Sequence, residues 1–356
     1  MTKPLPPFSC TYSPNVPELL SQLKCTIALS TYQAGKVVFL SATGSDKMIQ
    51  LPRTFSSAMG VAVSKNKLAV ACKSEVVVLA NTPSMASNYP PQPNTYDALY
   101  LPRAQYFTGQ LALHDMNWQN DKLVAINTLF SCISEVDEDF SFKPIWNPKF
   151  ISELNPEDRC HLNGMAMKNG NIEYVTALGE TNNYHGWREN KLKGGILIHV
   201  PTGEIITKDL PMPHSPRVYN DKLYVLLSAS GELVEVDPNN GTYKTITKLK
   251  YFVRGMAKVD DYLFIGHSKL RHNTSAFRDL PIAKESVKSG VLIVHLPTAS
   301  VVGYIRYENS VDEIYDVKIL PGLRRPGIVS HEKDTHKLAI TTPKDNFWAE
   351  EKKKKS

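Results

Sequence analysis

Residues 221–246 read DKLYVLLSASGELVEVDPNNGTYKTI, and this stretch indicates how the chain folds. Apolar residues run through 223–227, and a second mostly apolar segment, ELVEV, follows at 232–236. A cluster typical of turns, Pro238-Asn239-Asn240-Gly241, follows and leads into a third short segment. We interpret the stretch as three successive strands of a small antiparallel sheet, which begins after an Asp-Lys-Leu turn signal.

The same turn signal recurs along the chain, in clear or weaker copies. Its apolar residue stands at Leu68, Leu123, Ile172, Leu223 and Leu263, which gives gaps of 55, 49, 51 and 40 residues. A short strand precedes each signal and another follows it, so the Asn- and Asp-rich pairs predict hairpin turns. Four strands in each repeat of about 40–50 residues are typical of the blades of a β-propeller.

The two ends of the repeat array predict a closed ring. Residues 313–320 form a plausible sixth inner strand, and residues 26–30 and 36–41 supply the hairpin that this strand lacks. Closure of this kind removes exposed sheet edges. We therefore predict an all-β protein, a six-bladed β-propeller with four-stranded blades over residues 1–342. Residues 343–356 are predicted to be a flexible basic tail. An irregular β-sandwich or two small β domains are the alternatives.

Composition excludes several classes of protein. The net charge is +6, and Lys352 to Lys355 contribute four of these charges, so the remainder is only weakly basic and nucleic acid is not an expected partner. No run approaches 18 apolar residues and no signal peptide is evident, so no membrane association is expected. Five isolated cysteines favour reduced thiols and a cytoplasmic location.

The repeat aligns polar residues at the start of the inner strands. Nine positions before each turn residue stand Met59, His114, Asn163, His214 and Arg254. His161 lies two positions before Asn163, and aligning Tyr315 with Arg254 gives Glu313 the equivalent place in the sixth blade. Inner strands begin around one axis, so we expect these side chains to meet at the mouth of the central channel.

This convergence predicts a site with acid–base or metal chemistry. His114, His161, His214 and Arg254 are the candidate catalytic residues, because imidazole titrates near neutral pH. Imidazole also suits transition metals, so His114, His161, His214 and Glu313 are candidate ligands for one divalent Fe, Zn or Cu ion. Each histidine alone has a simpler interpretation as a hydrogen-bonded structural residue.

Long insertions are expected on the same face as the candidate site. Residues 179–188 and 267–289 interrupt the third and fifth blades, residues 81–111 lead into the second, and loops of this length are often functional. Arginine suits carboxylate and phosphate groups, so an anionic ligand group is expected. The candidate substrate-binding residues are Asn163, Trp187, Arg217, His267, Lys269 and Arg271.

Six stretches together carry a resemblance that covers residues 8–326. They are 30–35 (STYQAG), 113–116 (LHDM), 160–166 (CHLNGMA), 213–217 (PHSPR), 266–271 (GHSKLR) and 313–317 (EIYDV). The chain resembles a bacterial family of conserved hypothetical proteins, a domain of unknown function grouped with β-propellers. The resemblance implies the same fold and no activity. More distantly, the architecture is similar to that of gluconolactonase-like propellers, which bind a divalent cation through Glu, Asn and Asp, whereas this chain places histidines at the rim.

Two functions from different classes follow from these observations. The first is a divalent-metal-dependent or acid–base enzyme acting on a small or peptide-borne substrate with an anionic group. The second is a non-catalytic propeller that binds a protein or peptide on the same face, where Tyr, Trp and Arg are common anchors. The sequence does not decide whether the protein is an enzyme.

Overall fold

The predicted hairpin turns are present and explain how each blade begins. The computed structural model describes residues 4–270, 277 and 279–349. Strands β17 (Pro213–Tyr219) and β18 (Lys222–Leu227) pair so that Tyr219 faces Lys222, which leaves Asn220 and Asp221 as the turn. Both turn residues have positive φ, at 51° and 59°. This is the conformation of a two-residue hairpin turn, and Asn and Asp tolerate it better than most residues.

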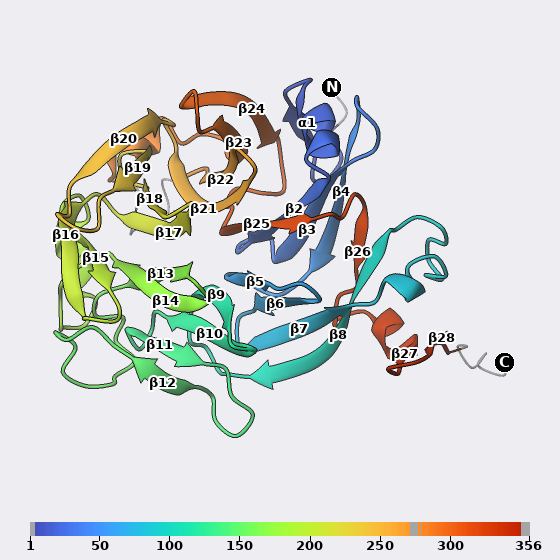
Figure 1. The fold of residues 1–356 in the computed structure, drawn as a ribbon, viewed down its shortest axis with the longest axis horizontal. Coiled ribbons are helices and arrows are strands. Elements are labelled where there is room, and N and C mark those ends of the chain that lie inside the picture. The colour runs from blue at the N-terminus through green and yellow to red at the C-terminus, as the bar shows by residue number, and fades with distance from the viewer. Residues whose placement is uncertain (1–3, 271–276, 278, 350–356) are drawn as a thin grey trace.

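Within the described residues, the strands form six sheets of a β-propeller, arranged as a ring around one axis (Figure 1). Five blades are continuous in the sequence. Blade 1 holds β5 (Val61–Val63), β6 (Lys67–Ala71), β7 (Glu75–Asn81) and β8 (Ala98–Phe107). Blade 2 holds β9 (Leu113–Gln119), β10 (Lys122–Asn127), β11 (Cys132–Glu135) and β12 (Lys143–Trp146). Blade 3 holds β13 (Leu162–Lys168), β14 (Asn171–Ala177), β15 (Gly195–His199) and β16 (Glu204–Leu210). Blade 4 adds β19 (Glu232–Val236) and β20 (Tyr243–Lys248) to β17 and β18, and blade 5 holds β21 (Phe252–Val259), β22 (Tyr262–Ser268), β23 (Ser289–His295) and β24 (Ser300–Tyr307).

Blade 6 joins the two ends of the chain, as predicted. Its inner strand β25 (Asp316–Pro321) pairs antiparallel with β2 (Cys25–Thr31), followed outward by β3 (Lys36–Ala42) and β4 (Met48–Thr54). The β2–β25 register runs from Cys25 opposite Pro321 to Ser30 opposite Asp316. The ring is therefore closed by main-chain hydrogen bonds between segments almost 300 residues apart.

Additional short elements lie around the ring. Strand β1 (Cys10–Tyr12) adds to the outer edge of β24, and β26 (Pro326–Ile328) pairs in parallel with β8. The described helices are α1 (Val16–Gln22), η1 (Pro83–Met85), η2 (Gly186–Asn190), η3 (Pro281–Lys284) and η4 (Asp334–Leu338). None of these helices has the length and apolar character needed to cross a membrane.

Two predicted boundaries differ from the structure. The predicted tail from residue 343 begins inside a hairpin of β27 (Ala339–Thr341) and β28 (Asn346–Trp348), where Trp348 packs against Tyr89 at 5.6 Å between ring centroids. Residues 350–356 lie outside the described part of the chain. The segment 81–111 is only partly a connection, because residues 98–107 form β8, the outer strand of blade 1.

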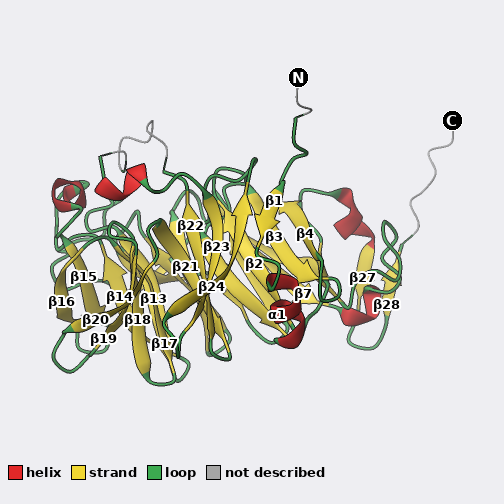
Figure 2. Cartoon of the chain, turned by 90° about the horizontal axis from the view of Figure 1, so that it is seen from above, coloured by secondary structure: helices red, strands yellow, loops and turns green. Residues whose placement is uncertain are grey.

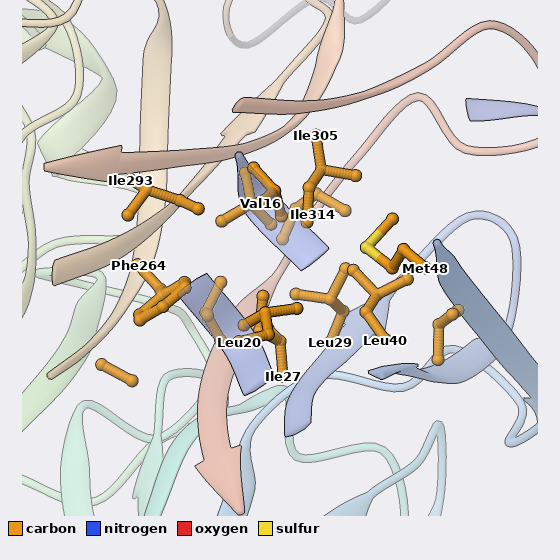
Figure 3. Packing of buried hydrophobic residues seen from close by; sticks show 14 of the residues in the cluster. Val16, Leu20, Ile27, Leu29, Leu40, Met48, Phe264, Ile293, Ile305 and Ile314 are labelled. Carbon is orange, nitrogen blue, oxygen red and sulfur yellow. The ribbon is translucent and has the colours of Figure 1, made fainter. Parts of the chain in front are cut away.

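The core consists of clusters between neighbouring blades. Val37 and Phe39 of β3 pack toward blade 1, whereas Val38 and Leu40 of the same strand pack toward blade 5. Alternate side chains of a strand point to opposite faces, so each sheet contributes to two clusters. Figure 3 shows the cluster between blades 5 and 6, which α1 also covers. Similar clusters occupy the other interfaces between blades, so the sheets hold one another in register around the ring.

The insertions of blades 3 and 5 meet above the ring. They connect β14 to β15 and β22 to β23, and the described parts of both lie at one face of the ring in the side view of Figure 2. Trp187 from the first insertion and Leu280 and Ile282 from the second share one hydrophobic cluster with Met212 and Phe252. The insertions therefore lie on the same face as the starts of the inner strands, as expected.

Candidate functional site

A repeated backbone conformation brings the chain into each inner strand. Ser57, Ala112, His161 and Met212 occupy the same place in four successive blades, and their φ values are 51°, 54°, 51° and 53°. A non-glycine residue rarely adopts this left-handed conformation. This recurrence shows that the positions aligned by the sequence repeat are structurally equivalent in these four blades. It also means that His161 departs from the simple alternation of a strand.

Aromatic rings from three blades converge where the inner strands begin, a place that we term the mouth of the channel. The rings of His114 and His161 lie 4.9 Å apart in an edge-to-face arrangement, and the ring of Tyr315 lies 5.3 Å from His114. Trp187 packs against His161 at 4.4 Å. The inner strands of blades 2 and 3, the residues before β25 and the insertion of blade 3 thus meet at one place.

An aspartate that the sequence analysis did not single out orients His161. The Nδ1 atom of His161 lies 3.0 Å from both carboxylate oxygens of Asp158, and Nε1 of Trp187 donates to Oδ2 of the same group at 3.0 Å. Nδ1 of His185 lies 3.4 Å from that oxygen. Because Nδ1–H of His161 faces a carboxylate, its Nε2 atom carries the lone pair. The only sequence signal for this pair is its spacing, three residues apart in Asp158-Arg159-Cys160-His161.

The predicted Arg254 lies at the mouth and is paired with the predicted Glu313. Nη2 of Arg254 donates to Oε1 of Glu313, and the guanidinium stacks on the Tyr315 ring at 3.8 Å. Both side chains are largely buried, with 10% and 23% of their surface exposed. The mouth therefore presents a cation and a carboxylate side by side, and Glu313 is already engaged by a positive charge.

Two of the mouth histidines are neutral at pH 7. Burial, reinforced by the charge of Arg254, lowers the pKa of His214 to about 3. Burial and the neighbouring His161 hold the pKa of His114 well below its usual range. Nδ1 of His214 lies 3.0 Å from the Met212 carbonyl oxygen and 2.8 Å from Oγ of Ser228, which itself donates to Val253. These contacts place the proton of His214 on Nδ1.

Other predicted binding residues have structural partners. The amide of Asn163 donates to the Pro213 carbonyl at 3.0 Å and accepts from Thr176 at 2.7 Å, so it joins blade 3 to blade 4. His267 is fully buried, and its Nδ1 lies 3.0 Å from the Lys288 carbonyl. Nζ of Lys269 lies 3.9 Å from Asp312, and Arg271 is outside the described residues. Of the six predicted substrate-binding residues, the structure places Trp187 directly against a mouth histidine.

Arg217 belongs to an ionic network that joins several blades. Its Nη1 atom donates to Asp115 and to the Met165 carbonyl, both at 2.8 Å, and its Nη2 atom lies 3.8 Å from Asp316. Lys318 lies 3.5 Å and 3.2 Å from the same two carboxylates. Asp115 also accepts from the Met165 N–H and Asp316 from the Val61 N–H, each in the next blade. This network accounts for Arg217 as a residue that holds the ring together.

The structure brings the predicted metal ligands near one another, but several of them are engaged by other protein groups. In the described part of the chain, no three His, Cys, Asp or Glu side chains are grouped so that they could hold a metal ion. Glu313 is paired with Arg254, and the Nδ1 atoms of His161 and His214 face oxygen atoms. The Nε2 atoms of His161 and His214 are the ring nitrogens that could still bind a metal. A bound metal therefore stays a prediction.

The ring of six four-stranded blades, with polar residues gathered at one mouth of its channel, defines a six-bladed β-propeller. The chain belongs to the family DUF4915, a domain of unknown function, which matches residues 14–329. This membership confirms the resemblance seen in the sequence. No curated protein matches the chain.

Solved structures of other proteins show the same fold at low sequence identity. A chain in a crystal structure of a nidogen/laminin complex is 11% identical, with a TM-score of 0.54 over 84% of this chain and 99% of that one. A protein of unknown function from Bacteroides caccae is 10% identical, with a TM-score of 0.50 over 83% of this chain and 98% of that one. At these identities, the likeness concerns the fold alone.

Proposed function

We propose that the mouth of the channel is an acid–base site, in which His161 moves a proton on a small or peptide-borne substrate. The observation that carries this proposal is the position of the His161 Nδ1 atom, 3.0 Å from both oxygens of Asp158. A carboxylate in this position fixes the tautomer and stabilises the imidazolium that forms when Nε2 accepts a proton. The Trp187 indole donates to the same carboxylate and packs against the His161 ring.

The proposed proton transfer involves only the substrate and the His161 side chain. An X–H bond of the substrate gives its proton to Nε2 of His161, and the imidazolium returns that proton to the leaving or rearranged group. Asp158 keeps its negative charge throughout, as the carboxylate of such a pair does in general. His114 and His214 remain neutral, because burial lowers their pKa values, so they serve as hydrogen-bonding groups in this scheme.

The charges at the mouth favour a polar substrate group over a strongly anionic one. The described cations that were expected to attract an anion are Arg217, Arg254 and Lys269, and each faces a carboxylate. Arg254 and Glu313 offer a donor and an acceptor next to each other. We therefore replace the anionic group predicted from the sequence with a neutral group that both accepts and donates hydrogen bonds, such as an amide.

The test is a search for substrate consumption with matched variants. Purified protein is incubated with a cell extract of metabolites and short peptides, and mass spectrometry records which compounds disappear and which form. We expect His161→Gln and Asp158→Asn to reduce turnover by roughly 100-fold or more, because each removes part of the proton-transfer pair. His199→Gln, on the outer part of blade 3, is the control and should retain turnover. Melting temperatures establish that the variants are folded.

Two results would overturn the acid–base proposal. Full turnover by folded His161→Gln would remove the role of this residue. No change in any compound with the wild-type protein, together with capture of a peptide or protein at the mouth, would favour the non-catalytic platform. Elemental analysis of the same preparation tests the predicted Fe, Zn or Cu ion, and loss of a bound metal in His114→Ala would favour the metal-dependent reaction.

A further inference from the structure

A groove beside blade 6 is lined by three positively charged side chains from separate segments. Lys36 begins β3, Arg53 lies near the end of β4, and Lys333 follows β26. The groove has a volume of about 340 Å³, which is within the size range of small-molecule sites. None of its described lining residues is acidic, and the remaining ones are Phe8, Pro52, Thr54, Tyr89, Pro91, Val329, Ser330 and Thr335.

The three cations have no carboxylate partner among the described residues. Nζ of Lys36 donates to Oγ1 of Thr54 at 2.7 Å, and Nη1 of Arg53 donates to the carbonyl oxygen of Pro52 at 2.9 Å. Lys333 is exposed, and the nearby Asp334 is paired with Lys337 at 2.8 Å. This differs from the mouth of the channel, where each described cation faces an acid. Within the described residues, the groove therefore has positive charge that no ion pair neutralises.

The rest of the lining is mostly aromatic and apolar. Tyr89 is buried, and Phe8, Pro91 and Val329 add apolar surface around it. Burial raises the pKa of the Tyr89 phenol, and the positive charge of Arg53 opposes this shift. A ligand with an anionic end and an apolar or aromatic body would meet matching groups in this groove.

We propose that this groove binds a small phosphate monoester, with its phosphate on Lys36, Arg53 and Lys333 and its organic part against Tyr89 and Phe8. A phosphate monoester carries a charge of about −1.5 to −2 at pH 7, which suits three cations better than a single carboxylate does. The planar guanidinium of Arg53 can donate two parallel hydrogen bonds to phosphate oxygens. The groove shares no lining residue with the mouth, so this proposal is independent of the proposed function.

Isothermal titration calorimetry at low ionic strength tests the proposal. The probes are phenyl phosphate and inorganic phosphate, titrated into the full-length protein. We expect phenyl phosphate to bind more tightly than inorganic phosphate, because only the ester reaches the apolar lining. Lys333→Gln and Arg53→Gln should each weaken phenyl phosphate binding by about tenfold, as expected for loss of one charge-assisted hydrogen bond.

Lys47→Gln is the matched control for these variants. Lys47 is exposed at the opposite end of the same β3–β4 hairpin, so its removal changes the net charge equally without touching the groove. Equal weakening by Lys47→Gln would overturn the proposal in favour of non-specific charge attraction. Absence of binding to the wild-type protein would also overturn it. Equal affinities for the two probes would overturn the assignment to a monoester and leave a site for free phosphate.

Discussion

Histidines at similar positions in the sequence repeat have different hydrogen-bond partners on their Nδ1 atoms. His161 has a carboxylate on its Nδ1 atom, whereas His214 has a carbonyl and a hydroxyl there. His267 is fully buried against the Tyr251 ring, and this burial lowers its pKa to about 4. A histidine that is buried in its neutral form resists protonation, so it links the stability of the fold to pH.

We expect the free energy of unfolding to fall as the pH drops from 6.5 toward 4. In this range the unfolded chain binds protons at His214 and His267, whose folded pKa values are about 3 and about 4, while the folded protein does not. By linkage, the two residues together should cost about 3 kcal/mol between pH 6.5 and pH 5. Urea denaturation at pH 7, 6 and 5 measures this slope.

A single variant isolates the contribution of one histidine to the slope. His267→Asn keeps a donor toward the Lys288 carbonyl but cannot titrate. Because His114 and His214 are also buried in the neutral form, this variant should remove roughly a third of the pH dependence. His295→Asn, which is not enclosed in the core, is the control and should leave the slope unchanged. An identical slope in His267→Asn and the wild type would show that this residue is already accessible to protons in the folded state.

At the scale of single elements, the inner strands approach one another so closely that one of them requires glycine. Gly255 interrupts the regular pairing of β21 with β22, and its φ is +80°. A Cβ atom at this position would lie 2.7 Å from the backbone nitrogen of Val317 in β25. The adjacent inner strands of blades 5 and 6 therefore touch through their backbones at this point.

Gly255→Ala should destabilise the protein by about 3 kcal/mol or more, through the left-handed backbone and the clash together. Gly170→Ala is a matched control, because Gly170 also has φ of +80° but has nothing within 4 Å of its Cβ position. That variant should cost only about 1–2 kcal/mol. Chemical denaturation of both variants measures the difference in stability. Equal losses of stability would mean that the inner strands of blades 5 and 6 can move apart without cost.

At the scale of the whole molecule, the closed ring makes each blade depend on its neighbours. Leu29 lies on β2, is fully buried, and packs in the cluster between blades 5 and 6 shown in Figure 3. Trp118 lies on β9 of blade 2, and Trp187 lies in the insertion of blade 3. Neither residue belongs to the interface between blades 5 and 6. In a closed ring, a loss of stability at one interface between blades should therefore make the other blades unfold more easily as well.

We expect Leu29→Ala to lower stability by about 3–5 kcal/mol, as large-to-small changes in a well-packed core do. Tryptophan fluorescence and circular dichroism should report one coincident transition, shifted equally by the variant. Val302→Ala, at a residue of β24 that is 36% exposed, is the control and should lower stability much less. A tryptophan transition that Leu29→Ala leaves in place would mean that blades 2 and 3 unfold independently of the closing blade.

Local patterns were sufficient to predict the blades and their closure. Strand periodicity and two-residue turns such as Asn220-Asp221 depend on neighbouring residues, so they are legible in the sequence itself. The constant spacing from each turn to the start of its inner strand then placed His114, His161, Arg254 and Glu313 on one face, and the structure brings these residues to the mouth.

The partners of those side chains could not be predicted from local patterns, because they come from distant parts of the sequence. Asp158 meets Trp187 from an insertion 29 residues later, and Arg217 meets Asp115 across 102 residues. Which charge neutralises which is decided by the packing of blades around the ring, since an ion pair requires atoms within a few ångströms. The sequence by itself determined the six-bladed ring and the face on which the polar residues gather. Only the tertiary structure decided that His161 is oriented by a carboxylate, that Arg217 is a structural cation, and that three cations without a carboxylate partner among the described residues line the groove beside blade 6.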